Sequence, residues 1–353
     1  MLGMEDDLMN FKDVEYKGCI LKEKEIIDLF YFKFLDIPLL SRMEAVAEYF
    51  IDQVETLRDR DLADEEKEEL TERFQRMYET RDCYILYSRF LEQEGYKALP
   101  RLPLEKRKLR YEDVYPILYL KYSLFRCKGH HGIKHVVVDE MQDYSWIQFV
   151  LLKKLFPCKM TILGDKAQTM EEQQQDVLKF LPKIFGRDIR KIVMNRSYRN
   201  TMEIAQYANR LTGVSDIELF DRHGDAVEEM QFKNLYTALD RVLEKWEQKR
   251  EDYETEALVL FTEREAEHAF LYLEEKLRTL DPDGEYQLTY MNRDSQNFKK
   301  GLTVTTFYLA KGLEFDQVFG VFHAEDNSGL AAQARYITAT RALHELHMYD
   351  VED

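Results

Sequence analysis

The chain has 353 residues, with 50 Lys and Arg against 67 Asp and Glu, which gives a formal net charge of −17. This length accommodates two domains, and an apolar content of 45% is enough for packed cores and excludes wholesale disorder. The negative charge excludes a protein that coats nucleic acid through bulk charge, because phosphate binding draws on Lys and Arg. Any contact with nucleic acid is therefore expected at a local basic patch.

The cysteines and the hydropathy of the chain indicate where it resides. Cys19, Cys83, Cys127 and Cys158 are widely spaced and form no CxxC pair, so we expect free thiols in a reducing compartment rather than a zinc site. No apolar run reaches the ~20 residues that a membrane span needs, and the first ten residues are acidic, unlike a signal peptide. We therefore expect a soluble, cytoplasmic protein without membrane contact.

The first part of the chain, residues 1–110, is predicted to be helical. Three stretches that mix apolar and charged residues predict helices: Leu21–Leu35, Arg42–Leu57 and Asp64–Glu94. Ser41 is expected to be the N-cap of the second helix, with Glu44 completing a capping box. Gly95 is expected to end the third helix.

A basic segment, Lys97–Arg110, follows these helices. It contains two prolines and one acid, Glu105, among six bases: Lys97, Arg101, Lys106, Arg107, Lys108 and Arg110. In so acidic a chain, this pattern is consistent with a phosphate or partner contact, and equally with a solvated linker.

From about Tyr111, helices alternate with short apolar strands, which is typical of a parallel α/β sheet. The predicted helices are Tyr111–Phe125, Ser145–Phe156, Glu171–Phe185, Asn200–Leu211, Leu235–Glu251, Glu263–Leu280 and Ala331–Ala342. The predicted strands are His135–Val138, Met160–Leu163, Lys191–Met194, Ala257–Phe261, Leu302–Thr306, Gln317–Phe322 and Glu345–Tyr349. We interpret these elements as two α/β layers, the first ending near Phe185 and the second beginning at Lys191.

Two carboxylates, Asp139 and Glu140, come directly after the apolar strand His135–Val138. Ligands of open α/β sheets bind beyond the carboxyl ends of the strands, so acids placed there can hold Mg²⁺ and polarise a water molecule. Acids that merely form the turn after a strand are a common alternative.

A second polar turn follows the next predicted strand and contains Gly164, Asp165 and Gln168. Glycine permits close approach of the backbone, and an amide side chain can donate and accept hydrogen bonds at once. An ordinary turn between a strand and a helix would also need Gly and Asp.

Two arginines are candidates for transition-state stabilisation. Arg199 follows Tyr198 where a strand passes into a helix, and Arg341 is the lone cation on a helix of small and apolar residues. A guanidinium is planar and always charged, so it can spread phosphoryl charge, although a buried ion pair with a helical Glu is a simpler explanation. Gly312 lets backbone amides approach a phosphate, and Glu314 can accept a hydrogen bond from a sugar hydroxyl.

Five segments together resemble the motifs of a known enzyme family. VVVDEMQDYS, TILGDKAQT, SYRNTMEIAQYAN, TTFYLAKGLEFDQVFGV and RYITATRALHEL are similar to motifs II, III, IV, V and VI of superfamily 1 helicases of the UvrD/Rep/PcrA type, in the family order. They extend over about Lys134–Leu346, which is 213 of the 353 residues. Tyr308 stands where UvrD-type members carry His, and the span from Arg199 to Lys311 is too short for their large inserted domain. Both features favour the helicase IV/HelD-like branch.

The resemblance implies an α/β fold with two RecA-like lobes on parallel sheets, the first incomplete, and an N-terminal helical region. The implied domains are a helical region at 1–110 similar to the 1B insertion, a partial lobe 1A at 111–188 with motifs II and III, and a lobe 2A at 189–353 with motifs IV, V and VI. ATP and Mg²⁺ would be the cofactors of the complete protein.

The resemblance also implies a role for each matched residue. The implied catalytic residues are Glu140, which orients or deprotonates water, Gln168, which senses the γ-phosphate, and the arginine fingers Arg199 and Arg341. The implied binding residues are Asp139 for Mg²⁺, Tyr198 for the base, Glu314 for the ribose, Gly312 and Asp165 for the nucleotide, and Tyr308 and Thr306 for nucleic acid.

The sequence departs from the family in two places. A P-loop of the form Gly-x4-Gly-Lys-Ser/Thr holds the β- and γ-phosphates, yet the chain contains no Gly-Lys dipeptide. We therefore expect the C-terminal part of a longer protein, inactive as an ATPase by itself. UvrD-type members also carry an aromatic residue after motif III that stacks on single-stranded DNA, and Thr169–Asp176 has none. Since such stacking contributes ~1–3 kcal/mol per base, its loss argues against strand separation.

Three functions remain open on these grounds. The chain is interpreted first as the motor portion of an ATP-dependent DNA helicase or translocase, which acts on single-stranded or tailed duplex DNA and works with an N-terminal P-loop portion of the same protein. The second is a HelD-like, ATP-driven factor that remodels or recycles RNA polymerase. The third is a non-enzymatic binding scaffold without a P-loop.

Overall fold

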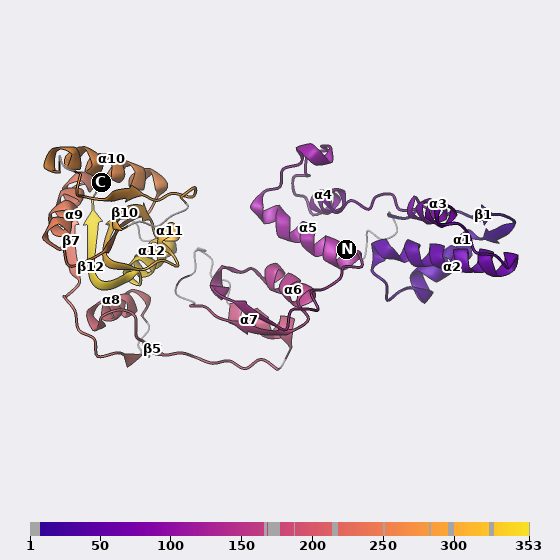
Figure 1. The fold of residues 1–353 in the computed structure, drawn as a ribbon, viewed down its shortest axis with the longest axis horizontal. Coiled ribbons are helices and arrows are strands. Elements are labelled where there is room, and N and C mark those ends of the chain that lie inside the picture. Colours follow the sequence, from indigo (N-terminus) through magenta and orange to yellow (C-terminus); the bar gives the residue numbers. More distant parts are fainter. Residues whose placement is uncertain are drawn as a thin grey trace. The chain divides into compact units, whose positions relative to one another are not determined.

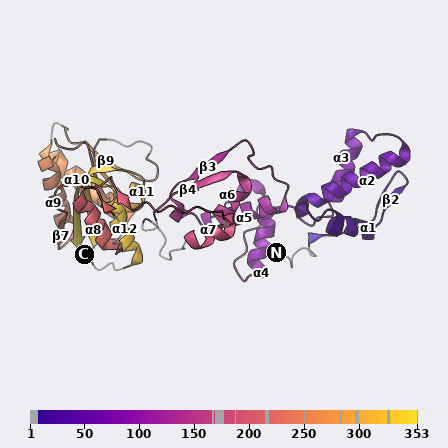
Figure 2. The same cartoon turned by 90° about the horizontal axis from the view of Figure 1, so that it is seen from below.

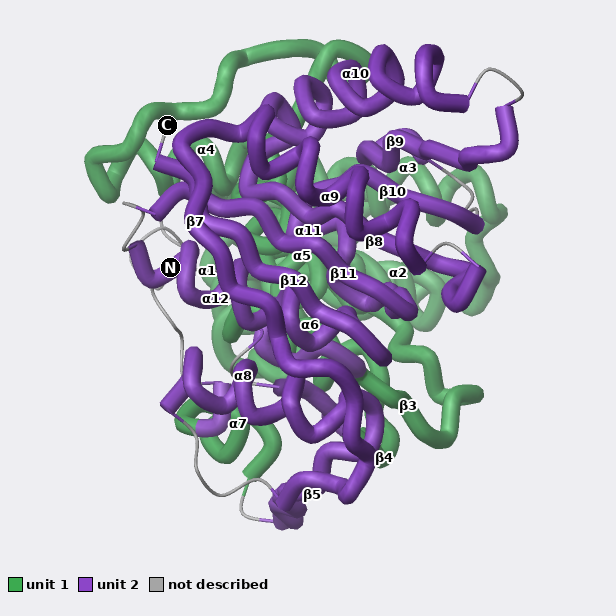
Figure 3. The backbone as a smooth tube through the Cα atoms, turned by 90° about the vertical axis from the view of Figure 1, so that its left-hand side faces the viewer, with its two compact units in different colours: residues 1–138, 144–161, 179–186 green, residues 139–143, 162–178, 187–353 purple. Residues whose placement is uncertain are grey.

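The computed structural model describes residues 8–165, 168, 177–186, 188–213, 218–249, 251–281, 284–295, 300–324 and 328–352 (Figure 1, Figure 2). The chain divides into two compact units (Figure 3). Unit 1 contains residues 1–138, 144–161 and 179–186, and unit 2 contains residues 139–143, 162–178 and 187–353. The turns that follow the first two predicted α/β strands thus belong to unit 2.

Unit 1 is mainly helical. Its elements are β1 (Val14–Tyr16), β2 (Cys19–Leu21), α1 (Glu23–Asp28), the π-helical turn η2 (Leu29–Lys33), η3 (Leu39–Ser41), α2 (Arg42–Arg58), α3 (Asp64–Gln75), α4 (Cys83–Gln93), η4 (Leu104–Lys106), α5 (Tyr111–Leu124), β3 (His135–Val138), α6 (Trp146–Leu155), β4 (Lys159–Ile162) and α7 (Val177–Phe185). β1 and β2 form an antiparallel hairpin, and β3 pairs with β4. The core of the N-terminal helices contains Phe30, Phe50 and Phe74, of which the last two meet edge to face at 5.8 Å.

Three sequence expectations for unit 1 are corrected. The predicted first helix begins only at Glu23, because the residues before it form the hairpin with β1. The capping box at Ser41 is wrong, since its hydroxyl accepts the amide hydrogen of Arg126 at 3.0 Å and makes no cap bond. The long helix predicted over Asp64–Glu94 is interrupted between α3 and α4, where the buried Tyr78 hydroxyl donates to the carbonyl of Leu39.

Unit 2 is built on a six-stranded sheet in the order β7-β12-β11-β8-β10-β9, and all of its strands are parallel. The unit contains η5 (Met141–Asp143), β5 (Arg196–Ser197), α8 (Met202–Thr212), β6 (Glu218–Leu219), β7 (Glu228–Phe232), α9 (Leu235–Lys249), β8 (Thr255–Leu260), α10 (Glu263–Leu280), β9 (Leu288–Tyr290), β10 (Gly301–Thr306), α11 (Phe307–Ala310), β11 (Phe315–His323), α12 (Gly329–Ala339) and β12 (Ala342–Val351). This sheet confirms the predicted α/β class.

Helices cover both faces of the six-stranded sheet (Figure 1). α8, α11 and α12 pack on one face around Ile204, Phe307 and Ile337. α9 and α10 pack on the other face around Trp246 and Leu273. Alternate residues of β8 and β12 enter the two cores, as expected for a parallel sheet buried on both sides.

The predicted strands differ from the structure at the borders of unit 2. β8, β10, β11 and β12 match predicted strands, whereas the edge strands β7 and β9 were not predicted. The strand predicted at Lys191–Met194 is wrong, since these described residues form no strand and the side chains of Ile192, Val193 and Met194 are exposed. Of the helix predicted at Glu171–Phe185, α7 confirms the second half, and residues 171–176 lie outside the described residues.

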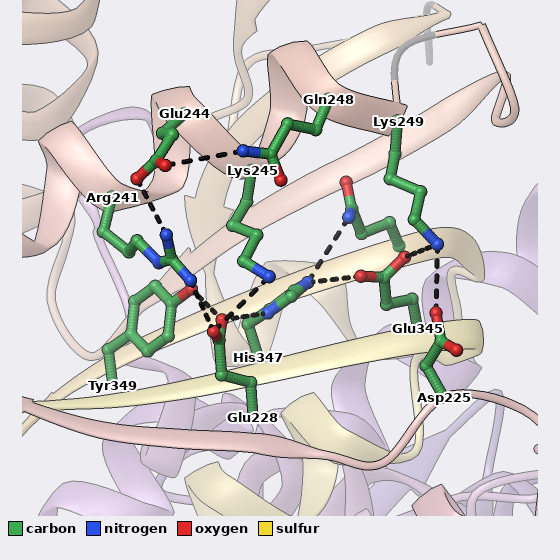
Figure 4. Close-up of polar contacts among 11 residues, drawn as sticks. Asp225, Glu228, Arg241, Glu244, Lys245, Gln248, Lys249, Glu345, His347 and Tyr349 are labelled. Carbon is green, nitrogen blue, oxygen red and sulfur yellow. Dashed lines mark hydrogen bonds and ion pairs between the residues drawn. The ribbon is translucent and has the colours of Figure 1, made fainter.

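A polar network around the buried residues His347 and Glu345 joins α9 to the edge of the sheet (Figure 4). The imidazole of His347 on β12 lies between two carboxylates, with Nδ1 2.7 Å from Glu228 of β7 and Nε2 2.9 Å from Glu345. Arg241 and Lys249 of α9 reach Glu228 and Glu345, at 2.7 and 3.4 Å. The network therefore ties one helix to two neighbouring strands through compensated charges.

Within the described ranges, none of the helices has both the length and the hydrophobicity to span a lipid bilayer.

Candidate functional site

Asp139 and Glu140 lie in a tight turn directly after β3. Glu140 has a φ of +53°, in the left-handed region that non-glycine residues rarely adopt. Its amide donates to Asp139 Oδ1 at 2.8 Å, and the amide of Met141 donates to the carbonyl of Leu163 at 2.8 Å. Such backbone strain persists only where surrounding contacts hold it and concentrates at functional sites.

The turn after β3 is coupled to the turn after β4 by Gln142, which is 7% exposed. Its Nε2 donates to Glu140, and its Oε1 accepts the amide hydrogen of Asp165 at 3.1 Å. Gly164 packs tightly here, because a Cβ at this position would lie 2.5 Å from Gln142 Oε1 and 2.8 Å from the nitrogen of Met141. The expected close backbone approach at Gly164 is thus confirmed, whereas the part played by Gln142 was not predicted.

The second turn makes contact with α12 and with the residue that follows it. Gln168 Nε2 donates to Asp165 Oδ2 at 3.0 Å, and the same oxygen accepts from the hydroxyl of Tyr336 at 3.0 Å. Burial and the charge of Asp165 raise the pKa of Tyr336, so its hydroxyl remains a donor. Gln168 Oε1 accepts from Arg341 Nη2 at 3.1 Å. Lys166 and Ala167 lie outside the described residues.

Arg341 is a buried cation, with 2% of the residue exposed. Besides Gln168, its guanidinium donates to the carbonyls of Leu313 and Ile337 at 3.2 and 3.3 Å and to the hydroxyl of Thr340. No carboxylate among the described residues lies within 4 Å of the Arg341 guanidinium. The alternative explanation, an ion pair with a helical Glu, is therefore wrong, since Glu140 and Glu314 pair with Lys311 and Arg199 instead. Burial and then the positive charge of Arg199 lower the pKa of Arg341.

Lys311 was missed as a site residue by the sequence reasoning. Its Nζ lies 2.6 Å from Asp143 Oδ2, 2.7 Å from the carbonyl of Gln168 and 3.6 Å from Glu140 Oε2. Its side chain is 6% exposed. The available signal was its position directly before Gly312, in the segment predicted to approach a phosphate.

Arg199 and Glu314 pair with each other at 2.8 Å, and both side chains are about half exposed. The charges of Arg199 and Glu314, and also that of Glu140, act on the pKa of Arg341, so these residues share one electrostatic neighbourhood. Gly312 adopts a φ of +83°, which favours glycine. The ring of Tyr198 is largely exposed and lies 5.6 Å from that of Phe220.

Tyr308 and Thr306 lie at the other edge of the sheet from these residues. They stand at and just after the carboxyl end of β10, whereas Glu314 and Arg341 precede the first residues of β11 and β12. The hydroxyl of Tyr308 donates to Glu263 at 2.8 Å. Thr306 is 1% exposed, and its contact with nucleic acid stays a prediction that requires this side chain to become accessible.

The residues present fit a nucleotide with a magnesium ion. Asp139 is exposed, and apart from the amide of Glu140 no described residue bonds to it, which leaves carboxylate oxygen free. No group of three or more His, Cys, Asp or Glu within the described ranges is arranged to hold a metal. Mg²⁺ commonly takes one or two carboxylates together with substrate phosphates. The uncompensated charge of Arg341 likewise fits an anionic ligand.

The comparisons with known proteins relate the chain to helicases. No family model matches it. Over 173 residues it is 25% identical to ATP-dependent DNA helicase Rep of Buchnera aphidicola subsp. Baizongia pistaciae, which covers 46% of this chain and 23% of that protein. The chain thus spans about a quarter of the length of this relative.

The solved structures that are similar to the chain include three helicases or helicase domains. The C-terminal domain of a possible DNA helicase from Lactobacillus plantarum WCFS1 has a TM-score of 0.35 and 24% identity, over 44% of this chain and 88% of that one. The helicase of PRRSV has a TM-score of 0.34 and 14% identity, over 63% of this chain and 36% of that one. The arterivirus nonstructural protein 10 helicase has a TM-score of 0.33 and 12% identity, over 77% of this chain and 51% of that one. Whole-chain scores this low do not establish a shared fold. The sequence similarity to Rep therefore relates the chain to DNA helicases without resolving a branch among them.

Proposed function

We propose that the chain is the motor portion of an ATP-dependent superfamily 1 DNA helicase or translocase, closest to the helicase IV/HelD-like branch. The observation that carries the proposal is the convergence of Glu140, Gln168, Lys311 and Arg341 within unit 2. These residues come from four separate segments of the chain, and each segment matches a motif of that family. An ordinary turn or a surface ion pair would not need all four.

The roles we propose follow from the contacts. Glu140 is placed to orient or deprotonate a water molecule, with Gln142 and Lys311 fixing its carboxylate. Asp139 would hold Mg²⁺, which supplies charge neutralisation at the phosphates when ATP is bound. Arg341 would stabilise transferring phosphoryl charge.

The coupling we propose runs through Gln168. Its amide bonds Asp165 of the same turn on one side and Arg341 on the other, so it connects the turn after β4 to the residues that follow α12. A residue that contacts a nucleotide and an arginine finger together can convert hydrolysis into relative motion of lobes. Arg199 and Glu314, which pair with each other here, would separate to contact phosphate and ribose.

We further propose that a P-loop segment of the same protein completes the site, because Gly-x4-Gly-Lys is missing from these 353 residues. The test is ATP turnover by the protein carrying such a segment, with single-stranded DNA present, compared with its Glu140→Gln variant. Turnover that Glu140→Gln abolishes supports the proposal. A variant as active as the parent protein contradicts it.

The lack of an aromatic residue in Thr169–Asp176 favours translocation or remodelling over strand separation. The measurement that separates these activities is displacement of a strand from a tailed duplex by the completed protein. We expect ATP turnover with little displacement. Efficient unwinding would contradict this and assign the protein to the strand-separating helicases.

A further inference from the structure

The basic segment Lys97–Arg110 connects α4 to α5 in unit 1 and is held in place by hydrogen bonds to α4. The amide of Leu99 donates to the hydroxyl of Ser88 at 3.0 Å. The hydroxyl of Tyr84 donates to the carbonyl of Pro100 at 2.8 Å. The segment is therefore a fixed part of the surface of unit 1 rather than a detached linker.

Two of the six bases in this segment are used to anchor it. Arg107 pairs with Asp82, and its guanidinium lies 4.5 Å from the centre of the Tyr84 ring. Arg110 Nε lies 3.1 Å from the buried carboxylate of Asp113. Both cations are thus paired with carboxylates of unit 1.

The other four bases are presented to solvent. Lys97, Arg101, Lys106 and Lys108 are all exposed, and none of these side chains forms an ion pair or hydrogen bond with another described residue. The segment contains only one acid, Glu105, in a chain with a net charge of −17. Solubility does not require a concentration of positive charge in so acidic a protein.

Exposed tyrosine rings stand at both ends of the segment. Tyr96 is 68% exposed and Tyr111 is 71% exposed. The ring of Tyr111 is supported edge to face by Tyr115, with 5.4 Å between the ring centres. Exposed rings beside unpaired cations offer both stacking faces and phosphate contacts.

We propose that Tyr96, Lys97, Arg101, Lys106, Lys108 and Tyr111 form a basic ridge that binds single-stranded nucleic acid, outside the nucleotide site. The cations contact phosphates and the rings stack on bases. An acidic protein surface would satisfy the cations but has no base faces for the rings, which is why a nucleic acid is favoured. The ridge deepens the proposed function and rests on it for the choice of nucleic acid as the ligand.

The test uses the 353-residue chain, a fluorescently labelled oligo-dT and no nucleotide, with binding followed by anisotropy over a series of KCl concentrations. The ridge variant carries Lys97→Gln, Arg101→Gln, Lys106→Gln and Lys108→Gln. The matched control carries Lys12→Gln, Lys24→Gln, Arg58→Gln and Arg60→Gln, which removes four exposed cations from the same unit. Each contacted phosphate of a single strand contributes about −0.7 to the slope of log K against log salt. We expect the ridge variant to flatten the slope by about 2.8, and the control to keep it.

Stacking is tested separately from charge. Tyr96→Ala with Tyr111→Ala is expected to weaken oligo-dT binding about fivefold or more without changing the salt slope. Tyr96→Phe with Tyr111→Phe keeps the rings and should bind like the parent chain. Equal losses for Phe and Ala would contradict stacking by these rings.

Three results would overturn the ridge: no binding of oligo-dT at low salt, the same slope for the ridge variant and the parent chain, or polyglutamate competing as well as oligo-dT. The last would assign the surface to an acidic protein. The assay needs no ATP, so its result does not depend on turnover at the nucleotide site. If oligo-dT binding confirms the ridge but the completed protein does not hydrolyse ATP, the proposed function is wrong and the ridge stands.

Discussion

Arg341 is held almost entirely out of water by uncharged oxygen acceptors among the described residues. A buried charge that lacks an opposite charge is costly, and proteins rarely keep one without a use for it. A phosphate group entering the site would supply the missing negative charge. The burial of Arg341 is thus explained by the nucleotide site that we propose.

In the completed protein, Arg341→Ala is expected to lower ATP turnover about 10³-fold or more while changing nucleotide affinity far less. The reason is that an arginine finger acts mainly in the transition state. The measurement compares kcat with the Kd of a non-hydrolysable ATP analogue, and a thermal melt by circular dichroism checks folding. Arg341→Lys keeps the charge but not the planar fork, and should also be slow. Equal losses in turnover and affinity would indicate a structural role instead.

Gly164→Ala is expected to lower the free energy of unfolding by about 1–3 kcal/mol, because the new Cβ would lie within 2.8 Å of the nitrogen of Met141, which is backbone and cannot move aside alone. Gly132→Ala is the matched control, since a Cβ there meets nothing within 4 Å. Urea denaturation followed by circular dichroism measures both. Equal urea midpoints for the two variants would contradict the close packing of the two turns around Gly164.

The sequence could point to Asp139 and Glu140 as acids that end an apolar strand, and to Arg341 as a cation in a segment of small and apolar residues. The structure places Arg341 in the turn after α12 rather than on the helix predicted over Ala331–Ala342. It could not identify Lys311, whose partners Asp143 and Gln168 lie more than 140 residues away along the chain. Contacts over such separations depend on the fold, and no local pattern encodes them.

At the scale of elements, the predicted strands were right where a strand is buried on both faces. β8 contains the run Ala-Leu-Val-Leu and β11 the run Val-Phe-Gly-Val-Phe, the pattern that a central parallel strand requires. β10 and β12 mix apolar with polar residues but are buried along most of their length. β7 reads Glu-Glu-Met-Gln-Phe and is largely exposed at the edge, so it has no apolar signal. Lys191–Met194 has that signal, yet its apolar side chains find no neighbouring strand in the described part of the chain.

The polar network between α9 and the sheet predicts a loss of stability in acid. Burial raises the pKa of Glu228, but hydrogen bonds from Arg241, Tyr349 and His347 outweigh it and lower this pKa to about 2. Burial also raises the pKa of Glu345, but the hydrogen bond and charge of His347 and the charge of Lys249 lower this pKa to about 2. Because the pKa of each carboxyl group is lower in the folded protein than its ordinary value of 4.5, the group stabilises the fold at pH values above 4.5. This stability is lost as pH falls from there towards 2.

Glu228→Gln is expected to reduce stability at pH 7 and to flatten its fall between pH 4.5 and 2, because the amide does not titrate. The measurement is the urea midpoint across this pH range. Glu267→Gln is the control, since Glu267 is exposed and has no ion pair among the described residues. An unchanged acid slope in Glu228→Gln would show that the network does not govern acid stability.

At the scale of the whole molecule, the net charge of −17 restricts where nucleic acid can bind. The four unpaired cations of the basic ridge are a concentrated exception in unit 1. The chain combines the α/β sheet and the segments that resemble helicase motifs with the absence of any Gly-Lys dipeptide from its sequence.

The most direct test of this account is ATP turnover, in the presence of single-stranded DNA, by the 353-residue chain alone and by the same chain completed with a P-loop segment. We predict negligible turnover by the chain alone, and turnover by the completed protein that Glu140→Gln abolishes. Robust turnover by the 353-residue chain, lost on Glu140→Gln, would contradict the account, because the site would then hold phosphate without a P-loop.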